Sequence, residues 1–138
     1  KVPHQWEYVH DHVGYNYRMP NLNASLGVAQ MESLDYFISK KRELAAAYKS
    51  FFDSIGISFF TEPENAFSNY WLNAVILGDR KERDKFLEYT NRAKVMTRPA
   101  WKLMNKLPMF AQCQAFHLEN ASWLEDRIVN VPSSVMIK

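Results

Sequence analysis

Between Pro20 and Ile55 the chain repeats apolar side chains at helical spacing. A helix is predicted to begin near Pro20, which suits a first helical position, or at Asn21, whose side chain could cap it. Residues 33–35 are predicted to bend or restart this helix. Over residues 35–55 the signal is stronger, with apolar side chains at i, i+4, i+7, i+8 and i+11: Leu44, Tyr48, Phe51, Phe52 and Ile55. Gly56 suits the position just after a helix end.

The second half alternates short apolar runs with polar helical segments. The pattern predicts strands over residues 57–60, 69–77, 94–97 and 129–131, helices over residues 79–92 and 120–128, and irregular loops over residues 98–101 and 107–116. The 69–77 strand is apolar at almost every position, so both its faces are expected to be covered. Asp79 with Glu82 has the spacing of a capping box. This order predicts an α/β domain with a small sheet and helices largely on one face.

Residues 1–20 show no sustained repeat and are predicted to form an extended arm with a turn at Gly14. The arm is rich in aromatic and imidazole side chains, namely Trp6, Tyr8, Tyr15, Tyr17, His4, His10 and His12. Because large amphipathic rings favour a surface to lie on, we expect the arm to pack on this domain or on another one.

Composition narrows the class of protein. The 138 residues suit one domain, and 47% hydrophobic residues exclude a disordered tail. A net charge of +2 with mixed signs does not favour a nucleic-acid partner, and no apolar run approaches the roughly 20 residues of a membrane span. The single cysteine, Cys113, favours a reducing compartment. Since Lys1 rather than a methionine opens the chain, we expect that a segment upstream has been removed.

Few residues suggest catalysis. His10 and His12 would point the same way from an extended arm, but only His4 lies near enough to join them, so no metal site is predicted. Cys113 and His117 lie four residues apart without an orienting group, which favours an inert cysteine. Glycine-rich phosphate loops and paired carboxylates are missing from the sequence, and no catalytic residue is predicted.

Two basic segments are candidates for anion binding. For Lys40, Lys41 and Arg42 with Glu43, a solvated charged face is favoured over an anion site. Asn16 and Arg18 place an amide and a guanidinium just before a helix N-terminus, an arrangement that suits a phosphate or a carboxylate. Alternatively, Asn16 satisfies loop backbone and Arg18 pairs with a surface carboxylate; the chemistry alone leaves both interpretations open.

The segment GYNYRMPNLNASLGVAQMESLDYFISKKR resembles the DegT/DnrJ/EryC1/StrS family of pyridoxal-phosphate-dependent sugar aminotransferases. Six residues fill the family's helix pattern: Asn23, Ala24, Gly27, Ala29, Gln30 and Leu34. Five further segments resemble the nucleotide-sugar branch that acts in surface-polysaccharide and nonulosonic-acid pathways: VPHQWEYVHD, SNYWLNAVIL, VMTRPAW, LPMF and VNVPSS. The resemblance therefore covers nearly the whole chain.

The resemblance implies a fold and a domain organisation. Residues 21–138 would be the small C-terminal domain of a fold-type I aminotransferase, a short mixed sheet packed by helices, and residues 1–20 an interdomain arm and active-site loop. The N-terminal large domain, which carries the lysine that forms the Schiff base with pyridoxal phosphate, would be absent. No catalytic residue is thus assigned to this chain, and the fragment alone is expected to be inactive. The parent would be a cytoplasmic homodimer with active sites shared between subunits.

The resemblance also implies roles for five residues. Asn16 would donate to the phosphate of pyridoxal phosphate, Arg18 would bind that phosphate or a substrate anion, and Tyr17 would form a wall of the site. Arg98 and Trp101 would line the sugar-nucleotide entrance; the alternative is that Trp101 belongs to the core and Arg98 to a surface pair. The implied reaction moves an amino group from glutamate to a keto-deoxysugar nucleotide for polysaccharide or glycan biosynthesis.

A second hypothesis is non-catalytic. The chain could be a stand-alone α/β regulatory or dimerisation module that binds a small anion or a partner helix. Ala24, Gly27 and Val28 would then form the surface for the partner. In either case apolar surface left uncovered predicts association.

Overall fold

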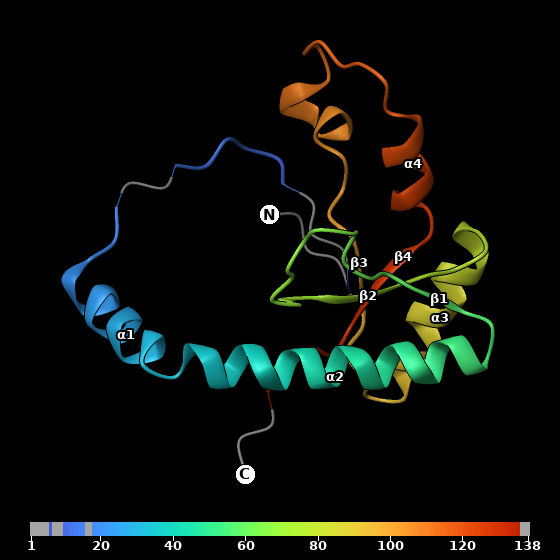
Figure 1. Ribbon diagram of the computed structural model, residues 1–138. Coiled ribbons are helices and arrows are strands. Elements are labelled where there is room, and N and C mark those ends of the chain that lie inside the picture. Colours follow the sequence, from blue (N-terminus) through green and yellow to red (C-terminus); the bar gives the residue numbers. More distant parts are fainter. Residues whose placement is uncertain (1–5, 7–9, 16–17, 136–138) are drawn as a thin grey trace.

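The computed structural model describes residue 6, residues 10–15 and residues 18–135. It contains four helices, two 3-10 turns and four strands among these residues (Figure 1). In chain order they are α1 (Asn21–Met31), α2 (Leu34–Ser54), β1 (Ser58–Phe59), β2 (Asn73–Ile76), α3 (Arg80–Arg92), β3 (Arg98–Pro99), η1 (Met104–Lys106), η2 (Pro108–Phe110), α4 (Glu119–Glu125) and β4 (Ile128–Val131).

The strands form one sheet in the order β1-β2-β4-β3. All three pairings are antiparallel, so the expectation of a mixed sheet is wrong. The reason is that β4, the last strand, inserts between β2 and β3 and runs opposite to both. Val75 therefore faces Phe59 on one side and Val129 on the other.

The core joins this row of side chains to α2 and α3. It contains eight buried residues, namely Ala45, Phe52, Phe59, Val75, Leu77, Leu87, Val129 and Val131. Phe52 of α2 stacks on Phe59 with ring centroids 6.5 Å apart, and Leu87 of α3 is fully buried. The two helices thus share one core with the sheet, as predicted. Trp6 also packs against this core, which confirms at that residue that the arm has a surface to lie on.

The helix boundaries follow the predicted signals. The first helix ends at Met31 and a second begins at Leu34, so the chain restarts where predicted. Gly56 follows the end of α2 with φ +73°. Asp79 caps α3 by accepting from the Glu82 N–H at 2.7 Å, while the Glu82 carboxylate accepts from the Gly78 N–H at 2.7 Å. The capping box is present, but the Glu82 carboxylate accepts from the N–H of the residue before the N-cap and not from that of Asp79 itself.

Two predicted strands have different bounds. The 69–77 strand shortens to β2, because Tyr70 has φ +44° and the side chains of Ser68 and Asn69 accept backbone N–H groups of the turn. The predicted 94–97 strand is a loop, and β3 begins instead at Arg98. Here Lys94 has φ +63°, and the Asn91 amide donates to the Thr97 carbonyl at 3.0 Å, which ties this stretch to α3.

Two helical predictions are also corrected. Within the predicted α2 stripe, Phe52 is buried but Phe51 and Ile55 are 58% and 53% exposed. Tyr48 and Phe52 of the predicted stripe face the core, and Ala45, which the stripe did not include, joins them there. The predicted 120–128 helix becomes α4, which ends at Glu125 and leaves Ile128 to β4.

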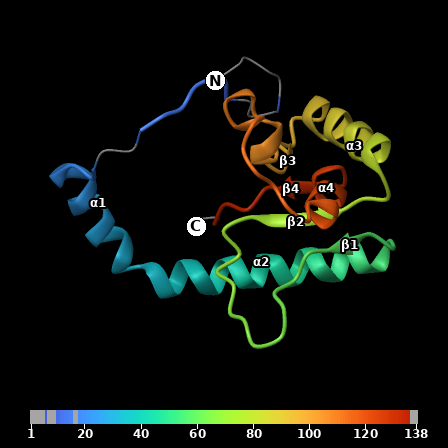
Figure 2. The same cartoon turned by 90° about the horizontal axis from the view of Figure 1, so that it is seen from above.

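Helix α1 stands apart from the sheet at the far end of α2 in both views (Figures 1 and 2). None of its residues is buried, and Leu22, Leu26 and Met31 are at least 60% exposed. Among the described residues, no helix has the length and apolarity needed to cross a bilayer.

Candidate functional site

Arg18, a predicted cofactor-binding residue, lies exposed just before α1. Pro20 occupies the N-cap position, and no side chain caps this helix. The N–H groups of its first turn therefore lack intrahelical partners, and the helix dipole adds positive potential beside the guanidinium. Asn16 and Tyr17 lie outside the described residues.

Arg98 and Trp101 lie on β3 and directly after it. Trp101 is 54% exposed and stacks on Trp71 with centroids 6.1 Å apart, so the alternative that it belongs to the core is wrong. Arg98 is half-buried, and its backbone pairs with Asn130 of β4. The stacked tryptophans thus stand beside Arg98 at one end of the sheet.

Three strand ends meet at this end of the sheet. Asn73 opens β2 opposite Val131, which closes β4, and Arg98 opens β3 opposite Asn130. A cavity of about 430 Å³ lies there, and we call it the sheet-end cavity. Its lining includes Lys41, Trp71, Met96, Arg98, Asn130 and Ser133. The predicted Arg98 is therefore joined by residues that the sequence did not single out.

Lys41 reaches the cavity from the middle of α2. Its ammonium donates to the Ser133 carbonyl at 2.7 Å and to the Trp71 carbonyl at 3.3 Å. Burial lowers the pKa of Lys41 below the usual value for a lysine. The predicted solvated face is thus wrong for this residue. The sequence named Lys41 only as part of a basic run, and nothing in that run distinguishes Lys41 from its neighbours Lys40 and Arg42.

The wall of the cavity is held by a buried polar contact. Asn73, which is buried, donates from its backbone N–H and its side-chain amide to Ser133 Oγ, at 2.8 and 3.2 Å. Ser133 Oγ in turn donates to the Val131 carbonyl at 2.8 Å. These bonds fix the chain after β4, including the carbonyl that binds Lys41.

A second set of contacts holds the loop that leads to Trp71. Arg42 binds both carboxylate oxygens of Glu62, at 2.9 and 2.6 Å, and the Ser68 carbonyl at 2.6 Å. Its guanidinium also lies 4.1 Å from the ring centre of Phe67. The bonds from Arg42, followed by the one from the Ser68 N–H, lower the pKa of Glu62 to about 2. We call this set of contacts the Arg42 latch.

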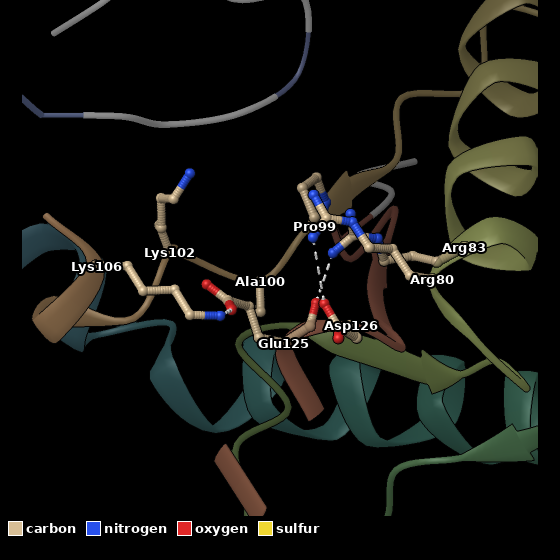
Figure 3. Close-up of a pocket in the computed structure, with 8 residues that line it drawn as sticks. All are labelled: Arg80, Arg83, Pro99, Ala100, Lys102, Lys106, Glu125 and Asp126. Carbon is tan, nitrogen blue, oxygen red and sulfur yellow. Dashed lines mark hydrogen bonds and ion pairs between the residues drawn. The ribbon is translucent and has the colours of Figure 1, made fainter. Parts of the chain in front are cut away.

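A smaller pocket of about 140 Å³ lies between α3, the loop after β3 and the end of α4 (Figure 3). It is lined by the basic residues Arg80, Arg83, Lys102 and Lys106 and the acidic residues Glu125 and Asp126. Figure 3 shows Glu125 turned toward Lys106, with which it forms an ion pair, and Asp126 turned toward Arg80, 3.7 Å away.

Three of the four basic residues that line this pocket, Arg80, Arg83 and Lys106, form ion pairs with acidic side chains. Buried Arg83 donates to the Asp84 carboxylate and to the Glu125 carbonyl, at 2.6 Å each. Burial would raise the pKa of Glu125, but Lys106 and the Leu103 N–H outweigh it and lower that pKa. The network joins α4 to α3 and is structural, so the sheet-end cavity is the better candidate site.

The sheet-end cavity is suited to binding rather than to proton transfer. Among the described residues that line it there is no carboxylate, thiol or imidazole. Cys113 lies elsewhere and is exposed. Described residues also offer no group of three metal-ligating side chains. What this cavity offers is two cations, amide and hydroxyl groups, and an indole face.

The family assignment follows from the whole chain. The sequence profile of the DegT/DnrJ/EryC1/StrS aminotransferase family matches residues 1–138. The chain belongs to this family. It is 34% identical over 129 residues to the GDP-perosamine synthase of Escherichia coli O157:H7, covering 92% of this chain and 34% of that protein. To the GDP-perosamine synthase of Vibrio cholerae it is 37% identical over 131 residues, covering 91% and 35%.

This chain therefore spans about a third of the length of these relatives.

Solved structures share its fold. The aminotransferase TlmJ from Streptoalloteichus hindustanus superposes with a TM-score of 0.75 at 19% identity, covering 86% of this chain and 32% of that one. The E. coli GDP-4-keto-6-deoxy-D-mannose-3-dehydratase with bound hydrated PLP superposes with a TM-score of 0.70 at 21% identity, covering 89% and 33%. The predicted α/β fold of a small aminotransferase domain is thus confirmed.

Proposed function

We propose that this chain is the C-terminal part of a pyridoxal-phosphate-dependent aminotransferase that transfers an amino group from glutamate to a keto-deoxysugar nucleotide. The match of the family profile to all of residues 1–138 carries this proposal. The GDP-perosamine synthases among its relatives favour a nucleotide-linked sugar as substrate. The parent enzyme would act in surface-polysaccharide or glycan biosynthesis, in the cytoplasm.

Pyridoxal phosphate, when bound, supplies the electron sink of transamination. This chain would hold its phosphate through Asn16 and Arg18, with Tyr17 as a wall. In support, Arg18 is exposed beside an uncapped helix N-terminus, which is a favourable place for a phosphate. The donors present therefore fit the phosphate of the cofactor.

The position of α1 favours a site shared between two subunits. The helix stands away from the sheet and buries none of its residues (Figure 2). A helix that stands away from its own sheet can bring the residues beside its N-terminus to a cofactor on a neighbouring subunit. We therefore propose a homodimer in which Asn16 and Arg18 serve the partner's cofactor.

On the substrate side, Arg98 and Trp101 would line the sugar-nucleotide entrance. Both stand at the sheet-end cavity or beside it, and Arg98 is a cation suited to a phosphate. This chain would thus bind and orient the reactants, while the Schiff-base lysine would come from the large domain.

The experiment is to read the coding DNA upstream of Lys1, produce the protein it encodes and assay it with glutamate and a GDP-linked keto-deoxysugar. We expect a pyridoxal absorbance band and an aminated nucleotide sugar detected by mass spectrometry. A protein that lacks both would overturn the proposal and favour the non-catalytic module.

A further inference from the structure

Lys41 contacts different groups from those that bind several other lysines of this chain. Its ammonium donates to two backbone carbonyls, those of Ser133 at 2.7 Å and Trp71 at 3.3 Å. Other described lysines form ion pairs with acidic side chains instead, namely Lys40, Lys49 and Lys106. A nearby carboxylate favours the charged form of a lysine through its opposite charge, and a neutral carbonyl supplies no such charge.

The two carbonyls are satisfied by the neutral amine as well as by the ammonium. An ammonium has three N–H donors, whereas a neutral amine has two N–H donors and one lone pair. Because Ser133 and Trp71 accept two bonds from Lys41, both carbonyls keep a donor when Lys41 loses a proton. The third position on Nζ is then the lone pair, which is the nucleophile. These hydrogen bonds therefore orient Lys41 without fixing its charge.

The surroundings of Lys41 also favour the neutral amine. Lys41 is half-buried and lines the sheet-end cavity of about 430 Å³, whose other charged residue in the described lining is Arg98. Acidic residues are absent from that described lining. Burial disfavours the ammonium and lowers the pKa of Lys41. A lysine that is desolvated beside a cavity has the environment of a nucleophilic lysine.

We propose that Lys41 is an acylation site that takes the acyl group of a small acyl phosphate such as acetyl phosphate. The Nζ lone pair forms an N–C bond at the acyl carbon, and the C–O bond to the phosphate breaks. The phosphate leaves with the electron pair, the proton of Nζ passes to water, and nothing is oxidised or reduced. The assignment does not depend on the proposed function, which gives Lys41 no role.

Acylation of Lys41 would weaken the contact between α2 and the segment after β4. The resulting amide is neutral and has one N–H, so one of the carbonyls of Ser133 and Trp71 would lose its donor. We expect chains acetylated at Lys41 to unfold at a lower urea concentration than unmodified chains.

The test is timed incubation of the full chain with acetyl phosphate, followed by mass spectrometry of its peptides. The reference is Lys102, an exposed lysine in the loop after β3. Lys41 should be acetylated faster than Lys102 at pH 7. The ratio of the two rates should fall as the pH rises to 10, because Lys102 then also loses its proton. This fall does not depend on how easily the reagent reaches either lysine.

Ser134 offers a matched pair of variants. It is exposed, lines the same cavity and follows Ser133 in the chain. Ser134→Asp places a carboxylate near Lys41 and should slow its acetylation at pH 7 by about threefold or more, because the carboxylate raises the pKa of the amine. Ser134→Asn has nearly the same size without the charge, and its Lys41 should react within roughly twofold of the parent rate. Neither variant should change the rate of Lys102.

Three outcomes would overturn the proposal. One is a ratio of Lys41 to Lys102 acetylation that stays constant between pH 7 and pH 10. Another is equal slowing of Lys41 in Ser134→Asp and Ser134→Asn, and the third is an unchanged ratio at pH 7 in a chain unfolded by urea. A full-length protein whose Lys41 reacts as expected but which has no aminotransferase activity would reject the proposed function alone.

Discussion

Three consecutive basic residues of α2 have three different environments. Lys40 pairs with Glu43 at the surface, Lys41 reaches the sheet-end cavity, and Arg42 forms the latch with Glu62. Successive side chains of a helix are turned by about 100°, so neighbours in sequence face different parts of the fold. A basic run that looks like one solvated face is thus divided into a surface pair, a half-buried group of the cavity and a structural contact.

The Arg42 latch makes stability depend on pH at the residue scale. The pKa of Glu62 falls from an ordinary 4.5 to about 2 in the folded chain. A lowered folded pKa contributes stability that is complete above about pH 4.5 and is lost as the pH falls toward 2. We expect Glu62→Gln to lower the urea midpoint at pH 7 and to converge with the parent chain near pH 2.

The matched control for that substitution is Glu64→Gln, in the same loop at an exposed position. Its unfolding midpoint should follow that of the parent chain from pH 7 to pH 2. Equal midpoints of Glu62→Gln and Glu64→Gln across this range would show that the latch adds no stability.

Asn16 carries a residue-scale prediction for the cofactor. In the full-length enzyme, Asn16→Ala should weaken retention of pyridoxal phosphate, because one donor to its phosphate is lost. The measurement is pyridoxal absorbance remaining after gel filtration, with Asn120→Ala on α4 as the control. Equal retention in Asn16→Ala and the parent enzyme would remove Asn16 from the site.

At the scale of elements, capping residues and glycines near the helix ends predicted most helix boundaries correctly. Other boundaries differ from the prediction because contacts with distant parts of the chain determine them. Asp79 with Glu82, and Gly56, marked helix ends that the structure confirms, because caps act within a few residues. The predicted 94–97 strand does not form. The Asn91 side chain, on the preceding helix, donates a hydrogen bond to the Thr97 carbonyl and so ties this stretch to the helix. No local pattern could reveal that the last strand enters the middle of the sheet.

Two glycines, one inside a helix and one just after a helix end, are expected to respond in opposite directions to the same change. Gly56 has φ +73°, where an added Cβ is unfavourable, so Gly56→Ala should destabilise by about 1 kcal/mol. Gly27 lies inside α1 with open space around its Cβ position, so Gly27→Ala should favour the helix by up to ~1 kcal/mol. Urea unfolding measures the first effect and helical circular dichroism the second. Unchanged or increased stability in Gly56→Ala would contradict the helix-end role of Gly56, and lower helicity in Gly27→Ala would contradict the prediction for α1.

For the whole molecule, the exposed side of α1 predicts association. Leu22 and Leu26 are 74% and 60% exposed on a helix that buries nothing. We expect the parent chain to sediment as a dimer or larger species and Leu22→Gln/Leu26→Gln to shift it toward monomer. Tyr89→Gln is the control, an equally exposed side chain on α3. A sharp monomer for the parent chain would contradict the prediction.

The sequence by itself determined the class of fold, most helices and the family, because hydrophobic period, capping residues and motif segments act over short distances. It also located Arg98 and Trp101 as a candidate pair. Only the tertiary structure decided the antiparallel strand order and the partners of Arg98. Lys41 and Ser133 are 92 residues apart in the chain, and their contact exists because β4 ends beside α2. Contacts at such separations depend on how the elements pack, which no local pattern specifies.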